Sequence, residues 1–152
     1  RLSRPWFQEA LDAGLSAEQY IELLGTLVAL VSIDSFCRGV GVPLHPFPIP
    51  QPGAPSNCRP PGAMQEDAWV PMIPVERATG AEADLYGGQP VGNVIRAMSL
   101  VPDEVRTLCD LSAAHYLPMG QVRDPSAAAG TLNRPQMELI AGRVSALRQC
   151  FY

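Results

Sequence analysis

The stretch from residue 43 to residue 74 constrains the fold more than any other part of the chain, because ten of its 32 residues are proline. Proline lacks the backbone N–H donor that helices and sheet ladders need. In residues 43–50 proline alternates with other residues, which favours extended polyproline II. We expect a connector over residues 43–85. It is either a surface linker or a packed strap that clasps a second subunit, and the bulky residues favour the strap. These residues are Phe47, Ile49, Trp69 and Val70.

Two helices are predicted before this connector. Pro5 suits the first turn of a short helix, and Ser16 with Gln19 forms a capping box for a longer one. The longer helix is apolar nearly all round at its middle, which predicts a buried position central to a core. It should end near Gly39 or Gly41, where glycine can adopt a left-handed conformation.

Three more helices are predicted after the connector. They cover about residues 91–99, 102–116 and 134 to the end. Asn133 and Gln136 form a variant capping box for the last helix. The glycines of residues 86–93 predict a turn rather than a phosphate-binding loop, because no strand precedes them and no lysine follows. No pair of strands is recognisable, so the predicted fold class is all-α, a helical bundle.

Composition and charge argue against several classes of function. With 152 residues, 47% of them apolar, the chain can bury a core of its own. A net charge of −4 and scattered basic residues give no basic patch for nucleic acid or an anionic membrane. All 11 basic residues are arginine, so the chain offers no lysine for a Schiff base. We expect no nucleic-acid partner and no membrane partner.

The apolar run Leu23–Ile33 also argues against a membrane span. Glu22 and Asp34 bracket only eleven residues, whereas a spanning helix needs about 20. The first residues show no basic segment followed by an apolar stretch and a cleavage site, so no secretory leader is predicted.

The cysteines and histidines form no recognisable metal site. Cys37, Cys58, Cys109 and Cys150 match no zinc spacing and are sparse for a disulfide scaffold. Neither of the two histidines has a ligand partner three or four residues away. We expect no metal, no cofactor and a reducing, cytoplasmic location.

The last helix carries an apolar stripe of side chains that we expect to be core. The stripe consists of Met137, Ile140, Val144, Leu147 and Phe151. Glu138 has a structural explanation, since a carboxylate near a helix N-terminus is favoured by the helix dipole. Cys150 is likewise explained as a structural residue.

Residues 86–152 nevertheless resemble the alkylhydroperoxidase D-like (carboxymuconolactone decarboxylase-related) family, in its peroxidase-related branch. The resemblance rests on the segments 93–97, 134–141, 144–145 and 150–152, and on the twelve-residue spacing from Glu138 to Cys150. It implies an all-helical, cofactor-free homo-oligomer that reduces hydroperoxides with a Cys-x-x-Cys dithiol, a Glu/His proton relay and a dithiol reductant protein.

By this resemblance Glu138 is the relay glutamate and Cys150 the resolving cysteine. The peroxide-attacking cysteine would follow Tyr152 directly, and the relay histidine would follow a few residues later. A resolving thiol alone cannot turn over, so we expect this chain as given to be inactive. Twelve residues of continuous helix would also separate Glu138 and Cys150 by about 18 Å along the axis.

The front of the chain resembles the closing helix of such a domain, through residues 16–25, 32–36 and 41–43. We therefore expect residues 1–42 to be the C-terminal half of one domain and 86–152 the N-terminal half of another, within a longer tandem protein. Two alternatives remain open. The chain is a non-catalytic helical module for oligomerisation, or it is a decarboxylase- or lactonase-like enzyme that needs no cysteine pair.

Overall fold

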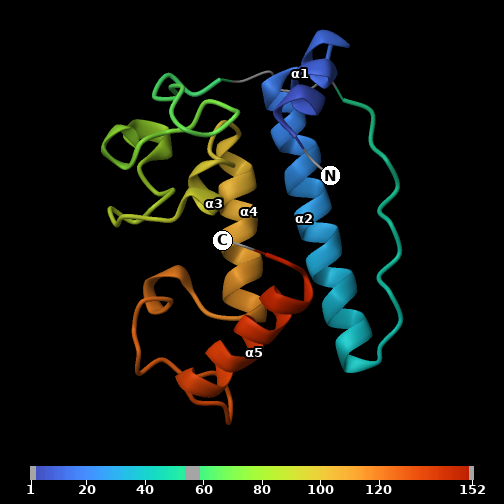
Figure 1. Ribbon diagram of the computed structural model, residues 1–152, viewed down its shortest axis with the longest axis vertical. Helices are drawn as coiled ribbons and strands as arrows, with labels where there is room; N and C mark the ends of the chain where they lie inside the picture. Colours follow the sequence, from blue (N-terminus) through green and yellow to red (C-terminus); the bar gives the residue numbers. More distant parts are fainter. Residues whose placement is uncertain (1–2, 54–58, 151–152) are drawn as a thin grey trace. The chain divides into compact units, whose positions relative to one another are not determined.

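The computed structural model describes residues 3–53 and 59–150, and it is helical (Figure 1). Its α-helices are α1 (Arg4–Asp12), α2 (Ala17–Val40), α3 (Asn93–Arg96), α4 (Pro102–His115) and α5 (Arg134–Leu147). Short 3-10 helices cover Val75–Arg77, Gly80–Glu82 and Met119–Gln121. No strand occurs over the described ranges, where pairing is limited to two isolated bridges, so the all-α prediction is confirmed. The chain divides into two compact units, Arg1–Leu111 and Ser112–Tyr152.

The predicted helix starts are confirmed by side-chain hydrogen bonds. The backbone N–H of Gln19 donates to Ser16 Oγ at 3.1 Å, and the N–H of Ser16 donates to Gln19 Oε1 at 2.9 Å. Pro5 lies in the first turn of α1, as expected. At the other end of α2, Gly41 adopts a φ of 74° and closes the helix where the sequence indicated.

The prediction that the second helix is buried at the centre of a core was wrong. Its buried residues are Ile21, Gly25 and Cys37, whereas Leu23, Leu27 and Val31 are each more than half exposed. The helix between its caps has 24 residues, more than twice the length of the apolar run between Glu22 and Asp34. By length and composition alone α2 could therefore cross a membrane. Only 11% of its apolar window is buried inside the structure. The α2 helix is apolar on all sides, and the residues packed around it cover only part of that surface.

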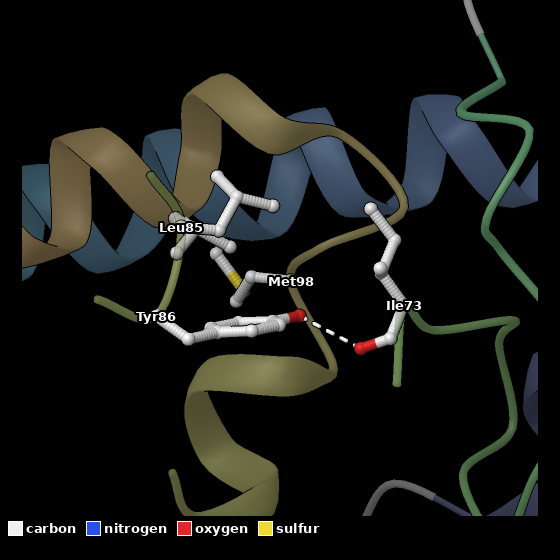
Figure 2. Close-up of a cluster of buried hydrophobic side chains, with 5 residues drawn as sticks. Ile73, Leu85, Tyr86 and Met98 are labelled. Carbon is white, nitrogen blue, oxygen red and sulfur yellow. Dashed lines mark hydrogen bonds between the residues drawn. The ribbon is translucent and has the colours of Figure 1, made fainter. Parts of the chain in front are cut away.

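The first unit has two apolar clusters that share Leu24 of α2. In one of them, buried hydrogen bonds connect members of the cluster (Figure 2). The Tyr86 hydroxyl donates to the carbonyl of Ile73 at 2.9 Å. The backbone N–H of Ile73 donates to Ser99 Oγ at 2.8 Å, and that hydroxyl donates to the carbonyl of Arg96. These bonds fix the segment around Ile73 against residues up to 26 positions away.

The proline-rich stretch behaves differently in its two parts. Residues 43–53 run without helical or strand structure (Figure 1), and Phe47 and Ile49 are 78% and 82% exposed. Packing of these two side chains within the chain is therefore not observed. In contrast, Val70 is buried, and the Trp69 ring lies 5.8 Å from the Phe7 ring. Within the described residues, the later part of the connector is therefore packed against the chain itself, and a strap that clasps a second subunit stays a prediction.

Two smaller differences concern the segment after this strap. The glycines at 87 and 88 form the expected turn. The helix predicted over residues 91–99 is only four residues long, α3, and its Gly92 N-cap has no side chain to accept a hydrogen bond.

Candidate functional site

Both predicted site residues belong to the second unit, where α5 begins with a complete cap. The N–H of Gln136 donates to Asn133 Oδ1 at 3.1 Å, and the N–H of Asn133 donates to Gln136 Oε1 at 3.0 Å. Pro135 occupies the first turn, where its missing N–H costs no hydrogen bond. This local geometry places Glu138 in the second turn of the helix.

Glu138 accepts two hydrogen bonds from residues that the sequence analysis did not single out. The Tyr116 hydroxyl donates to Glu138 Oε1 at 2.5 Å. The guanidinium of Arg134 lies with its Nε 2.7 Å from the same oxygen. The Arg134 guanidinium also stacks 5.8 Å from the centre of the Tyr116 ring, so the three side chains form one cluster.

Arg134 is held in place from the other side by the loop that follows α4. Its Nη2 donates to the carbonyl of Val122 at 2.5 Å, and its Nη1 reaches the carbonyl of Gln121 at 3.4 Å. A guanidinium that satisfies two carbonyls and a carboxylate has little freedom to rotate. Arg134 therefore fixes the carboxylate of Glu138 relative to the loop.

These contacts determine the charge of the carboxylate. The hydrogen bond from Tyr116 and the nearby Arg134 cation lower the pKa of Glu138 below its ordinary value. The same hydrogen bond, with the negative charge behind it, raises the pKa of the Tyr116 hydroxyl. At neutral pH the site therefore holds an ionised carboxylate and a neutral phenol, and the carboxylate can accept a hydrogen bond.

The apolar stripe of α5 is not core, contrary to the prediction. Met137 is buried with Leu117 and Ala127, but Ile140, Val144 and Leu147 are each more than half exposed. Phe151 lies outside the described residues. Besides α5, the described residues of the second unit form only the end of α4 and one short 3-10 helix, which leaves the rest of the stripe uncovered within this unit.

Instead, the exposed stripe lines an open cavity of about 510 Å³ within the second unit. Its walls are mostly apolar, formed by Ala129, Leu132, Met137, Ile140, Ala141 and Val144. Polar side chains of three further residues complete the lining, and these are His115, Tyr116 and Ser145. We call this space the α5 cavity.

The prediction that the last helix runs to the end of the chain was wrong. The helix ends at Leu147, where the N–H of Gln149 donates to the carbonyl of Ala146 and the N–H of Cys150 donates to that of Ser145. This pair of bonds is a Schellman motif, which here needs a left-handed residue, and Gln149 supplies it with a φ of 53°. A non-glycine residue in this role gives no stop signal in the sequence.

Cys150 is an exposed free thiol, placed beyond this turn. Its backbone is tied to Ser145, whereas Glu138 is engaged near the start of α5 by Tyr116 and Arg134. None of the contacts of the described residues joins Glu138 to Cys150, and the continuous helix on which their expected separation was based ends at Leu147. Cys109 is partly buried, and burial with the charge of Asp110 raises the pKa of its thiol, which disfavours a reactive thiolate.

One of the two partners of Glu138 could have been found from the sequence. Arg134 precedes Glu138 by four residues, a spacing that places two side chains on the same helix face. Tyr116 stands 22 residues away across an irregular loop, and no local pattern relates it to Glu138.

Over the described ranges, no group of three or more His, Cys, Asp or Glu side chains is arranged to hold a metal ion. No family model, no curated protein and no solved structure matches the chain.

Proposed function

We propose that this protein is an alkylhydroperoxidase D-like, peroxidase-related oxidoreductase that acts as a cytoplasmic homo-oligomer. One observation carries the proposal: Glu138 is an ionised carboxylate fixed by Tyr116, and the exposed thiol of Cys150 stands at the family's spacing from it. The residue resemblance over 86–152 supports the same assignment.

In the proposed reaction a thiolate attacks one oxygen of the hydroperoxide and the O–O bond breaks. The leaving alkoxide takes a proton and departs as an alcohol, while the attacking thiolate becomes a sulfenic acid. The Cys150 thiol then condenses with the sulfenic acid, which releases water and forms a disulfide. A protein dithiol reduces that disulfide by exchange. The attacking cysteine would follow Tyr152, so it is not among these 152 residues.

The role of Glu138 follows from its surroundings. A carboxylate with a lowered pKa stays ionised, so it can accept a hydrogen bond from a relay partner over most of the pH range. Tyr116 and Arg134 both bind Oε1, and in this proposal Oε2 accepts the hydrogen bond of the relay partner. Tyr116 and Arg134 are thus positioning residues in this proposal.

The test compares two purified chains in a dithiol-coupled assay with cumene hydroperoxide. One is the 152-residue chain; the other is extended after Tyr152 by a cysteine, three residues and a histidine. We expect turnover from the extended chain alone, with loss in its Cys150→Ser variant and a reduced rate in Glu138→Gln. Extended Cys109→Ser is the matched thiol control and should keep its rate. Circular dichroism would verify the fold of each variant.

Turnover by the 152-residue chain, or an extended Cys150→Ser chain as fast as its parent, would contradict the dithiol proposal. Activity toward a lactone or carboxylate substrate that survives Cys150→Ser would instead favour the decarboxylase- or lactonase-like alternative.

A second candidate function is helical assembly without catalysis. The exposed apolar side chains of α2, among them Leu23, Leu27 and Val31, favour it because a free surface of this kind marks an interaction site. Sedimentation velocity would compare Leu27→Glu with Thr26→Glu, a change at an exposed polar neighbour. Assembly through this face predicts dissociation in Leu27→Glu alone. An equal oligomeric state in both variants would refute it.

A further inference from the structure

We propose that residues 43–52 are a polyproline II ligand, which docks into a groove lined by exposed aromatic rings on a different protein. This inference concerns a partner of the chain and does not rest on the proposed function. It gives a role to a segment that belongs to none of the three apolar clusters of the described residues.

The sequence restricts the backbone of this segment almost completely. Five of its ten residues are proline, which fixes φ at about −65°, and four others directly precede a proline, which disfavours the α region. Only Leu44 has neither restriction. The segment is an extended trace after α2 (Figure 1), and none of its backbone groups pairs with another described backbone group. Little conformational entropy is therefore lost when a partner binds it.

The three residues per turn of polyproline II give the segment three edges of different chemistry. One edge carries His45 and Gln51, and their polar side chains bond within the segment. His45 Nδ1 lies 3.0 Å from the carbonyl oxygen of Pro46, and Gln51 Nε2 donates to the carbonyl of Ile49 at 3.4 Å. The other two edges are wholly apolar, and they consist of Leu44, Phe47 and Pro50, and of Pro43, Pro46, Ile49 and Pro52.

The apolar edges are open to water and carry no charge. Phe47 and Ile49 are the most exposed large apolar side chains of the described residues. A segment that only connects two elements gains nothing from exposing such side chains, whereas a partner that covers them removes apolar surface from water. Residues 39–58 contain no Asp, Glu, Lys or Arg, so ion pairs cannot contribute to recognition there. Grooves lined by aromatic rings bind proline-rich segments through apolar contact of this kind.

The aromatic cluster of this chain is not such a groove. Phe7 is 4% exposed, and its ring lies 4.9 Å from the ring of Tyr20 and 5.8 Å from that of Trp69. The cluster is therefore filled by its own side chains and cannot receive the segment of a second copy. This favours a different protein as the partner.

The test titrates three purified polyproline-binding probes, an SH3 domain, a WW domain and an EVH1 domain, into the isotopically labelled 152-residue chain. NMR measures both the affinity and the location of binding. We expect saturable binding of at least one domain, with amide shifts confined to residues 42–53. The affinity should be the same at low and at high salt, because screening acts on ion pairs and not on apolar contact.

Three variants at exposed positions separate the apolar edges, the polar edge and the backbone conformation. Phe47→Ala removes the ring from an apolar edge and should weaken binding about ten-fold or more. Gln51→Ala is the matched control on the polar edge and should leave the affinity unchanged. Pro48→Ala keeps both apolar edges but releases one fixed φ, so it should weaken binding roughly two- to five-fold.

The absence of binding to all three domains, equal affinities in Phe47→Ala and Gln51→Ala, or shifts outside the segment would overturn the inference. Sedimentation velocity of the chain alone tests the other occupant. Self-association that Phe47→Ala abolishes and Gln51→Ala preserves would mean that a second copy binds the segment, and the assignment to a different protein would fall.

Discussion

The carboxylate of Glu104 lies directly over Gly25, in the space where a β-carbon at that position would stand. Glycine in a helix interior costs about 1 kcal/mol relative to alanine, but here it lets Glu104 pack against the backbone of α2. Burial, together with the negative charges of Glu22 and Asp103, raises the pKa of Glu104. The contact thus places a carboxylate where its charge is disfavoured.

Glu104→Gln should therefore stabilise the protein at neutral pH. Because the folded pKa lies above the ordinary value of 4.5, folding favours the protonated form. The cost of the charge is absent below the unfolded pKa and grows as pH rises through the folded pKa. Urea denaturation at pH 7 should show the variant to be more stable, and at pH 3.5 it should equal the parent. Glu76→Gln, at an exposed position, is the control, and a less stable Glu104→Gln at pH 7 would contradict the assignment.

Tyr116→Phe should raise the pKa of Glu138 towards its ordinary value, because the hydroxyl is the largest cause of the lowered value. The stability that this hydrogen bond contributes is present above the unfolded pKa and is lost as pH falls through the folded pKa. Carbon-13 NMR titration of the Glu138 carboxyl measures the shift directly. An unchanged pKa in Tyr116→Phe would show that Arg134 alone holds the charge.

Met137→Ala should destabilise the second unit by about 2–5 kcal/mol, the range for truncating a buried aliphatic side chain. Ile140→Ala, three residues along the same stripe, removes a half-exposed side chain and should cost less than about 1 kcal/mol. Thermal unfolding monitored by circular dichroism compares the two. Equal losses would mean that Ile140 is covered in solution, for example by a second copy of the chain.

Ser99→Ala should cost about 1–3 kcal/mol, because it leaves the N–H of Ile73 buried without an acceptor. Tyr86→Phe is a milder change, since it leaves the carbonyl of Ile73 without a donor but keeps the ring in the cluster. Guanidinium unfolding of both variants ranks them. A neutral Ser99→Ala would show that water reaches the Ile73 amide.

The elements that sequence reasoning located well are those specified by local chemistry. The capping boxes at Ser16 and Asn133 and the glycine at 41 each act within a few residues. The starts of α2 and α5 and the end of α2 could therefore be predicted from the sequence alone. Exposure could not be predicted in the same way. The apolar periodicity of α2 and α5 indicates which faces avoid water, but only the number of neighbouring elements decides whether a face is covered.

The candidate site was predictable to the same extent. Glu138 was singled out from its spacing to Cys150 and its match to a family pattern, whereas the Tyr116 contact depends on how the 18-residue segment 116–133 returns from α4 to α5. The end of α5 was missed because Gln149 adopts a conformation that its residue type rarely takes.

The hydrogen bond from Ile73 to Ser99 also bears on how the chain is made. A ribosome adds about 5–20 residues per second, so the apolar segment around Ile73 waits on the order of seconds for its acceptor, 26 residues later, to be synthesised. Pro71 and Pro74 flank that segment and cannot donate to a β-ladder. The two prolines therefore limit the run of backbone donors that this apolar segment could offer to a strand of a neighbouring nascent chain during the interval.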